Sequence, residues 1–191
     1  NLINGSRDMN KNGTIEPYED WHNPIETRVN DLLSRMTSLE KAYQMFYNGQ
    51  AYPLSGWMFG PMQPQDLYNK QLTTATTRLG IPFVVPGDTI HGYMTTYPVQ
   101  SALAAGRDYL TIYQLGDMQR REEVAVGARG VLGPLAEVDT KVLYPRFQEG
   151  NGENADIAAA VVRALVSGLQ GGPELNPGSV LVTTKHWPGE G

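Results

Sequence analysis

The apolar run at residues 130–139, GVLGPLAEVD, decides the fold class, because it is one of three similar runs in the chain. The other two are residues 81–86, IPFVVP, and residues 179–184, SVLVTT. Each run is short, apolar and bounded by Gly, Pro or charged residues, which is typical of a buried β-strand. The three runs therefore predict three strands of one sheet.

Helical patterns fill the two intervals between these runs. Apolar residues recur at helical spacing from about residue 111 to 129 and from 154 to 170, and Gly171-Gly172 follows the second pattern as a stop signal. Alternation of strands and helices is typical of parallel βαβ units. The sequence therefore predicts an α/β fold in which parallel strands alternate with helices.

The N-terminal part, up to about residue 78, shows no alternation of strands and helices. Residues 1–23 are polar and predict an irregular arm. A helix is expected to begin at residues 23–26, with Asn23 as its cap, and a second at Thr37, where Glu40 completes a capping box. A long loop over residues 48–64 and a helix over residues 65–78 are expected to follow.

Polar residues follow each of the three predicted strands: Asp88, Asp139 and the pair Lys185-His186. Because ligands of parallel sheets and barrels bind beyond the carboxyl ends of the strands, we expect these side chains to converge on one rim. A carboxylate can accept hydrogen bonds from adjacent sugar hydroxyls, and Lys and His can donate to them. On position alone, a turn or cap role accounts for Asp88 equally well.

The Gly-rich segment 144–154, YPRFQEGNGEN, carries Arg146 after the second strand. An Arg on a rigid loop can direct its planar guanidinium at an oxygen-rich ligand. From the residues alone, a surface loop with a weak Arg146–Glu149 salt bridge is the favoured interpretation. Trp187, next to His186, predicts either a flat face on which a sugar stacks or a buried aromatic side chain.

Residues 8–19, DMNKNGTIEPYE, satisfy the calcium-loop pattern D-x-[DN]-x-[DN]-G-x5-E. Calcium binds six to eight oxygens. The candidate ligands are the side chains of Asp8, Asn10 and Asn12, the carbonyl of Thr14 and a bidentate Glu19. Few residues precede the loop and Pro17 interrupts its exit, so a structural loop rich in Asx turns is the alternative to a structural Ca²⁺ site.

Composition excludes several classes of protein. The chain has 15 Lys+Arg against 20 Asp+Glu, a net charge of −5, which argues against a general nucleic-acid binder. It has no Cys and no apolar run long enough to span a membrane. It begins without Met or a signal peptide, so we expect a processed or trimmed protein, periplasmic or secreted.

Five segments together resemble the N-terminal part of family 3 glycoside hydrolases, the β-glucosidase family. They are residues 31–41 (DLLSRMTSLEK), 78–82 (RLGIP), 87–92 (GDTIHG), 145–154 (PRFQEGNGEN) and 185–189 (KHWPG). Each segment alone is a weak signal, but their order and spacing match the family, and the resemblance covers nearly everything from Asp8 onward.

The resemblance implies a (β/α)8 TIM-barrel-like fold, of which residues 24–191 form the first part only and residues 1–23 a separate arm with an EF-hand-like loop. It implies that Asp88, Arg146, Lys185 and His186 hold hydroxyls of the terminal, non-reducing sugar. The partners implied are the remaining barrel and a second domain, in the same gene or a second chain, with no nucleic acid and no membrane.

The activity implied is that of an exo-acting, retaining β-glucosidase for oligosaccharides or aryl and alkyl β-glucosides, with no cofactor in catalysis. In the family the nucleophilic Asp and the acid/base Glu lie beyond the segment that matches residues up to Gly191, so no catalytic residue is assigned here. The alternatives are a non-catalytic, calcium-stabilised carbohydrate-binding or scaffold module, and a β-xylosidase of the same family.

Overall fold

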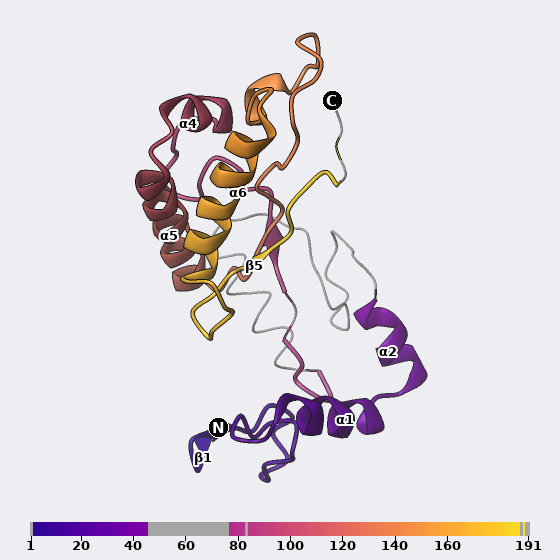
Figure 1. Ribbon diagram of the computed structural model, residues 1–191. Helices are drawn as coiled ribbons and strands as arrows, with labels where there is room; N and C mark the ends of the chain where they lie inside the picture. The colour runs from indigo at the N-terminus through magenta and orange to yellow at the C-terminus, as the bar shows by residue number, and fades with distance from the viewer. Residues whose placement is uncertain (1, 46–76, 83, 188, 190–191) are drawn as a thin grey trace. The chain divides into compact units, whose positions relative to one another are not determined.

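The computed structural model describes residues 2–45, 77–82, 84–187 and 189. The chain divides into two compact units, Asn1–Val84 and Val85–Gly191 (Figure 1). The loop predicted over residues 48–64 and most of the helix predicted over 65–78 lie outside the described residues.

The first unit begins with a hairpin of two short antiparallel strands, β1 (Leu2–Ile3) and β2 (Ser6–Arg7). Asn4 and Gly5 form the turn with positive φ angles of 51° and 82°. Both angles suit the two-residue loops that match the twist of a hairpin. No sequence pattern predicts this hairpin, because two-residue strands are too short to show an alternating pattern.

Helix α1 (Ile25–Arg35) is tied to the N-terminal arm by backbone and side-chain hydrogen bonds. Asp31 Oδ2 accepts from the Tyr18 N–H at 3.1 Å, and Arg28 Nε donates to the Tyr18 carbonyl at 3.3 Å. The boundary expected at residue 23 therefore does not coincide with the division of the chain into units, because α1 belongs with the arm.

The expected cap of α1 is wrong. Pro24 occupies the N-cap position, with no side-chain cap hydrogen bond. The Asn23 amide instead donates to the Pro17 carbonyl at 3.1 Å. Proline fixes φ near the value a helix start needs, so the helix begins here without a capping side chain.

The capping box at α2 (Ser38–Gln44) is confirmed. Thr37 Oγ1 accepts from the Glu40 N–H at 3.2 Å, and Glu40 Oε2 accepts from the Thr37 N–H at 2.8 Å. Glu40 also binds Arg78, with 3.0 Å between Nε and Oε1. The hydrogen bond from Arg78 is the main cause that lowers the pKa of Glu40 to about 2, so this carboxylate stays charged and holds α2 to the segment before the sheet.

The second unit contains the three predicted strands in one parallel sheet. They are β3 (Pro86–Gly87), β4 (Gly130–Val131) and β5 (Leu181–Val182), in the order β3-β4-β5. The parallel α/β architecture is therefore confirmed for this part of the chain.

The strands are shorter than the apolar runs that predict them. Strand β3 overlaps its predicted run only at Pro86. Pro134 interrupts the second run, and proline lacks the N–H that a sheet ladder requires. Pairing resumes beyond Pro134 as an isolated parallel bridge between Leu135 and Lys185. The chain therefore continues alongside its neighbour toward the carboxyl edge without forming a longer regular strand.

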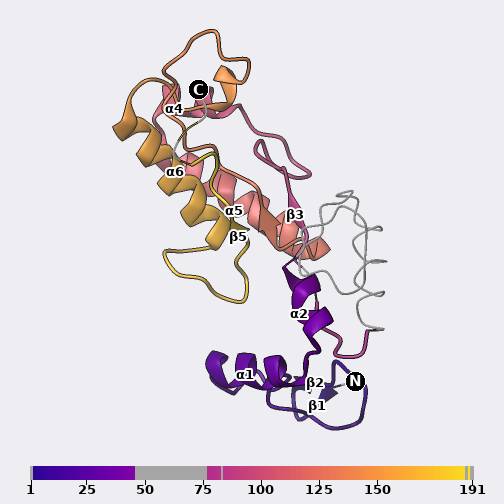
Figure 2. The ribbon, with the colours of Figure 1, turned by 90° about the vertical axis from the view of Figure 1, so that its right-hand side faces the viewer.

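Two helices, α5 (Tyr109–Val126) and α6 (Ala155–Gln170), pack side by side in the second unit (Figures 1 and 2). Glycines allow the close contact. A Cβ on Gly116 would lie 2.8 Å from the Leu165 carbonyl oxygen, and one on Gly168 would overlap the Tyr113 carbonyl oxygen. Both predicted helices are confirmed, and Val124 of α5 and Leu169 of α6 pack in one cluster with Val131 of β4.

The caps of α6 follow the sequence signals. Asn154 Oδ1 accepts from the N–H groups of Asp156 and Ile157 at 2.9 and 3.1 Å. Gly171 ends the helix in the left-handed conformation, with φ of 73°. The apolar side of α6 buries Val161 and Leu165 against α5, and it buries Leu169 against Val131 of β4 and Val180, which precedes β5.

A further short helix, α4 (Gln100–Gly106), carries a buried amide that substitutes for a strand neighbour. Gln100 donates to the Leu135 carbonyl at 2.9 Å and accepts from the Leu135 N–H at 2.9 Å. Asn151 donates to the same carbonyl at 2.8 Å. The backbone beyond Pro134 is therefore satisfied by side chains where the regular ladder stops.

Candidate functional site

Asp88 and Lys185, which are 97 positions apart in the sequence, meet at the carboxyl edge of the sheet. Lys185 Nζ lies 2.6 Å from Asp88 Oδ1. Asp88 directly follows β3, and the backbone of Lys185 is fixed by hydrogen bonds with Pro134 at 3.1 Å and Ala136 at 2.7 Å. The Asp88 side chain is 49% exposed and that of Lys185 is 17% exposed, so a ligand can reach the pair.

His186 is oriented by a buried carboxylate that the sequence analysis did not assign. Glu137 Oε1 lies 2.6 Å from His186 Nδ1 and accepts the His186 N–H at 2.9 Å. Glu137 is only 3% exposed. A charge inside an otherwise apolar run was the available signal, because a buried carboxylate needs a specific partner.

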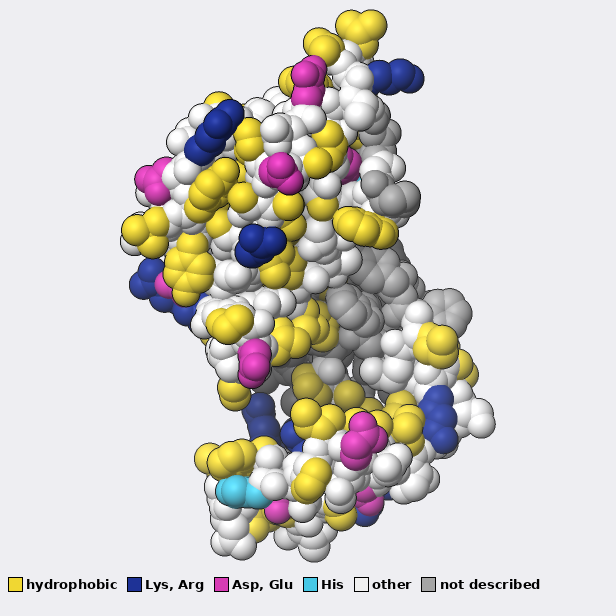
Figure 3. Space-filling view, in the orientation of Figure 1, with side chains coloured by type: hydrophobic (Ala, Val, Ile, Leu, Met, Phe, Trp, Pro, Cys, Tyr) yellow, Lys and Arg dark blue, Asp and Glu magenta, His cyan; other side chains and the backbone are white. Residues whose placement is uncertain are grey.

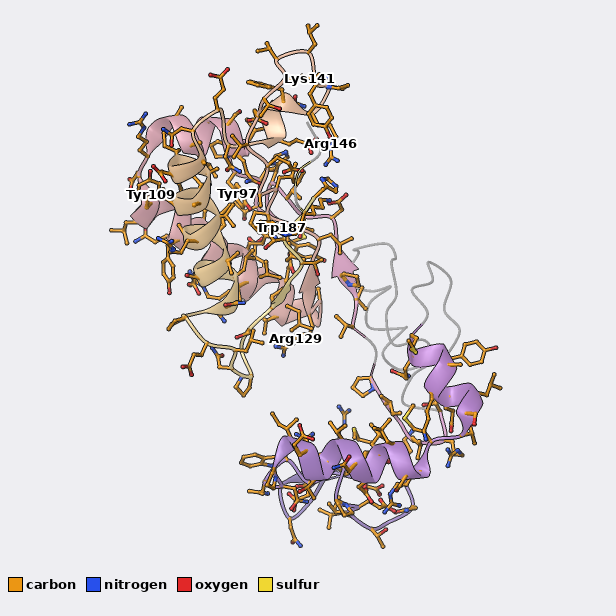
Figure 4. The ribbon with its side chains drawn as sticks, turned by 45° about the vertical axis from the view of Figure 1, so that its right-hand side comes forward. Tyr97, Tyr109, Arg129, Lys141, Arg146 and Trp187 are labelled. Atoms are coloured by element: carbon orange, nitrogen blue, oxygen red, sulfur yellow. The ribbon has the colours of Figure 1, made fainter. Side chains whose placement is uncertain are left out.

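Arg146 lies on the loop after β4, where a short 3₁₀ helix η1 (Phe147–Glu149) places Glu149 beside it. Arg146 Nε lies 2.9 Å from Glu149 Oε2. The pairing of these two side chains, expected from the sequence, is confirmed. Figure 4 shows Arg146 and Lys141 at one end of the second unit, with Arg129, just before β4, at the opposite end. Arg146 therefore lies at the carboxyl end of the sheet, on its own loop.

Asp139 does not take the place on the rim that its position predicts. Its Oδ2 accepts the Gly152 N–H at 2.6 Å, and a Cβ on Gly150 would overlap its carboxylate. Burial raises the pKa of Asp139 above its usual range, against the lowering effect of the Gly152 N–H. The side chain is turned into the loop that carries Arg146, so its visible role is to hold that loop.

A buried polar network lies directly behind Asp88. The next residue, Thr89, donates from Oγ1 to Glu123 Oε1 at 2.7 Å, and Gln119 Nε2 donates to the same oxygen at 2.8 Å. Tyr97 donates to Gln119 Oε1 at 2.8 Å. The signal in the sequence was the spacing of Gln119 and Glu123, which falls on the buried face of α5.

Trp187 is exposed, so the buried alternative for this side chain is wrong. It borders an apolar groove of about 460 Å³ that is otherwise lined by α6 and by residues Ala136 and Val138. Hydrophobic side chains gather over α6 on this face of the second unit (Figure 3). The groove lacks the carboxylates and amides that hold sugar hydroxyls, so it is separate in chemistry from the Asp88–Lys185 pair.

The five candidate metal ligands of the N-terminal arm lie in one folded loop. Gly13 N–H donates to Asp8 Oδ2 at 3.1 Å, Asn12 N–H to Asn10 Oδ1 at 3.0 Å, and Thr14 N–H to Asn12 Oδ1 at 2.8 Å. Glu19 returns to the start of the loop, where its Oε1 accepts the Met9 N–H at 2.8 Å. Among the described residues, no group of three or more His, Asp or Glu side chains could hold a metal ion. Any metal bound by this loop would therefore need the amide and backbone carbonyl oxygens as well as the carboxylates.

Comparisons with known proteins find relatives of this chain. The model of the glycosyl hydrolase family 3 N-terminal domain matches residues 56–191. A periplasmic beta-glucosidase/beta-xylosidase from Dickeya chrysanthemi is 32% identical over 97% of this chain and 35% of its own length. Beta-glucosidase C from Emericella nidulans is 30% identical over 87% of the chain and 33% of its own length.

Solved structures show the same fold. A beta-glucosidase from Listeria innocua in complex with isofagomine matches with a TM-score of 0.78 and 25% identity, over 86% of this chain and 26% of that protein. These matches define the class of protein as a glycoside hydrolase. The chain belongs to glycoside hydrolase family 3, which confirms the resemblance seen in its motifs. It spans about a third of the length of the curated relatives it matches.

None of the helices among the described residues is both long and apolar enough to cross a membrane.

Proposed function

We propose that the protein carrying this chain is an exo-acting, retaining β-glucosidase, and that this chain contributes the part of its site that holds the terminal sugar. The contact between Asp88 and Lys185 carries the proposal, because it places an accessible carboxylate and an ammonium side by side at the carboxyl edge of the sheet. The names of the Dickeya and Emericella relatives support glucosides as the substrates.

The chemistry of the rim suits a sugar. A carboxylate such as Asp88 accepts from two adjacent hydroxyls, while the Lys185 ammonium donates to a third or bridges to the same ones. In its neutral form with the proton on Nδ1, His186 donates to Glu137 and carries its acceptor lone pair on Nε2. In this tautomer, the role proposed for His186 is to accept a hydrogen bond from a sugar hydroxyl at Nε2.

Retention requires two further carboxyl groups, one nucleophilic and one protonated, about 5–5.5 Å apart. We assign neither to a residue of this chain. The proposed contribution of Asp88, Arg146, Lys185 and His186 is to position the glycone, since correct orientation of a bound substrate supplies a large share of the rate. No metal or cofactor enters this proposal for catalysis, and the periplasmic relative favours a periplasmic or secreted protein.

The test is hydrolysis of p-nitrophenyl β-D-glucoside by the whole protein that carries this chain. Asp88→Ala should lower kcat/KM by at least about 100-fold, because it removes a charged hydrogen-bond acceptor from the transition state as well as from the substrate. Glu174→Gln, which changes an exposed carboxylate on a distant loop of the same unit, is the control. A near-normal kcat/KM for Asp88→Ala would remove its assigned role, and an inverted anomeric product seen by NMR would refute retention.

A β-xylosidase is the second candidate, because the name of the Dickeya relative includes both activities. A glucoside differs from a xyloside by the hydroxymethyl group on the pyranose ring. Measured on the whole protein, the ratio of kcat/KM for p-nitrophenyl β-D-glucoside and β-D-xyloside decides between them. A ratio below one would favour the xylosidase.

A further inference from the structure

We propose that the loop Asp8–Glu19 binds a calcium ion that stabilises the first unit. The proposal starts from Asp8, whose side chain is only 2% exposed. Its Oδ2 accepts the Gly13 N–H from across the loop, but its Oδ1 is buried and has no hydrogen-bond partner among the described residues. A buried carboxylate oxygen without a partner is costly, and a cation is one of the few groups that offset that cost.

A second carboxylate is buried in the same loop. Glu19 is 4% exposed, and its Oε1 accepts N–H groups of Met9 and Asn10 at 2.8 and 3.1 Å. Its Oε2 accepts the Glu16 N–H at 3.0 Å. These bonds bring the last residue of the motif back onto the first ones, so that Asp8 and Glu19 belong to one closed loop.

Within residues 2–45 and 77–82, neither buried carboxylate forms an ion pair with a Lys or Arg. The Arg that reaches the loop, Arg35, lies 3.5 Å from Glu16 instead. Two buried negative charges in one short loop therefore have backbone N–H groups as partners and no positive charge. A bound divalent cation would balance Asp8 and Glu19, which is the physical reason to infer one.

The remaining ligands identify the cation as a hard, oxygen-seeking one. Asn10 and Asn12 each use their amide oxygen to accept an N–H two residues on, and the chain wraps around these oxygens with Gly13 at φ of 87°. Carboxylate, amide and carbonyl oxygens without nitrogen or sulfur favour Ca²⁺. Ca²⁺ accepts irregular coordination geometry, whereas Mg²⁺ requires near-octahedral geometry, so an irregular loop of this kind favours calcium.

The loop also has a route by which binding would stabilise its surroundings. The Tyr18 hydroxyl donates to the Leu79 carbonyl at 3.1 Å, and Gly80 lies so close to Met9 that an added Cβ would overlap the Met9 carbonyl oxygen. Fixing residues 8–19 would therefore fix the segment around Leu79 as well. This inference does not depend on the proposed glycosidase activity.

Calcium titration of the chelator-treated, intact chain tests the inference. We expect saturable binding of one equivalent of Ca²⁺ with a dissociation constant of about 10⁻⁴–10⁻³ M, the range of extracellular modules. Thermal unfolding in 10 mM CaCl₂ should have a midpoint several degrees above that in EDTA, and MgCl₂ should give a smaller rise. If calorimetric titration shows no saturable heat of Ca²⁺ binding, and the midpoint of thermal unfolding is the same in CaCl₂ and in EDTA, the proposal is overturned.

Asp8→Asn is the informative variant, because it keeps an acceptor for the Gly13 N–H and removes the charge. It should weaken Ca²⁺ binding by at least about 10-fold and abolish the calcium-dependent rise in midpoint, whereas Glu26→Gln, an exposed carboxylate on α1, should leave both unchanged. Asn12→Ala, at an exposed position, provides a second ligand variant should Asp8→Asn fail to fold. Calcium binding by both ligand variants at wild-type strength would refute the assigned ligands.

Discussion

Glu123 shows how a buried carboxyl group can make the free energy of unfolding depend on pH. Burial is the main cause that raises the pKa of Glu123 from 4.5 to about 7, although hydrogen bonds from Gln119 and Thr89 lower it in part. The folded chain therefore binds this proton more tightly than the unfolded chain does. Between pH 4.5 and 7 the free energy of unfolding should fall as pH rises, by at most about 3 kcal/mol.

Glu123→Gln should remove this part of the pH dependence, because the amide keeps an acceptor oxygen for Thr89 and Gln119 and carries no charge. Urea unfolding at pH 5 and pH 8 measures this pH dependence. Between these two pH values, the free energy of unfolding should fall more for the wild-type protein than for the variant. Glu153→Gln, an exposed carboxylate, is the control and should follow the wild type. Equal losses in wild type and Glu123→Gln would contradict the assignment.

At the level of single residues, the sequence predicted site residues that directly follow a strand. It did not predict the polar residue that lies within an apolar run. Asp88 and Lys185 directly follow apolar runs and do meet. Glu137 lies within such a run, so its contact with His186 depends on packing that no local pattern displays. Asp139 was expected on the rim, but Gly150 lets the following loop approach so closely that it captures the carboxylate.

At the scale of elements, the close packing of α5 and α6 predicts a sharp sensitivity at Gly168. Gly168→Ala places a Cβ against the Tyr113 carbonyl and 2.9 Å from the Asp117 nitrogen, so the helices must separate. We expect a loss of about 1–3 kcal/mol in the free energy of unfolding, measured by urea denaturation. The matched control is Gly106→Ala in α4, where an added Cβ meets nothing within 4 Å. Equal stability of the two variants would contradict the close-packing argument.

The elements differ in how far their sequence signals specify them. Helices α2 and α6 both have a capping side chain at their first turn, and their starts were predicted correctly. Helix α4 has Val99 at its N-cap and no capping side chain, so no capping signal in the sequence marks its start. Gln100 is buried because its amide hydrogen-bonds the backbone of Leu135, which is far away in the sequence. Strand lengths depend on which neighbours can pair, a long-range property that the apolar runs alone do not contain.

At the scale of the molecule, the chain covers about a third of its curated relatives, and none of its carboxylates is assigned as nucleophile or acid. We therefore expect the 191-residue chain by itself to give no turnover of p-nitrophenyl β-D-glucoside above the uncatalysed rate. The whole protein, assayed in parallel, is the positive control. Steady hydrolysis by the isolated chain would show that two of its own carboxyl groups perform the reaction.

Under the proposed function, the pairing of charges along the rim favours uncharged sugars over charged ones. Lys185 is matched by Asp88 and Arg146 by Glu149, while His186 contacts Glu137, so each of these basic side chains already has an acidic neighbour. A uronic acid or a phosphorylated sugar would bring an extra negative charge to carboxylates that are already balanced, and repulsion would follow. An uncharged pyranose exchanges hydroxyl hydrogen bonds with the same groups and leaves the electrostatic balance as it was.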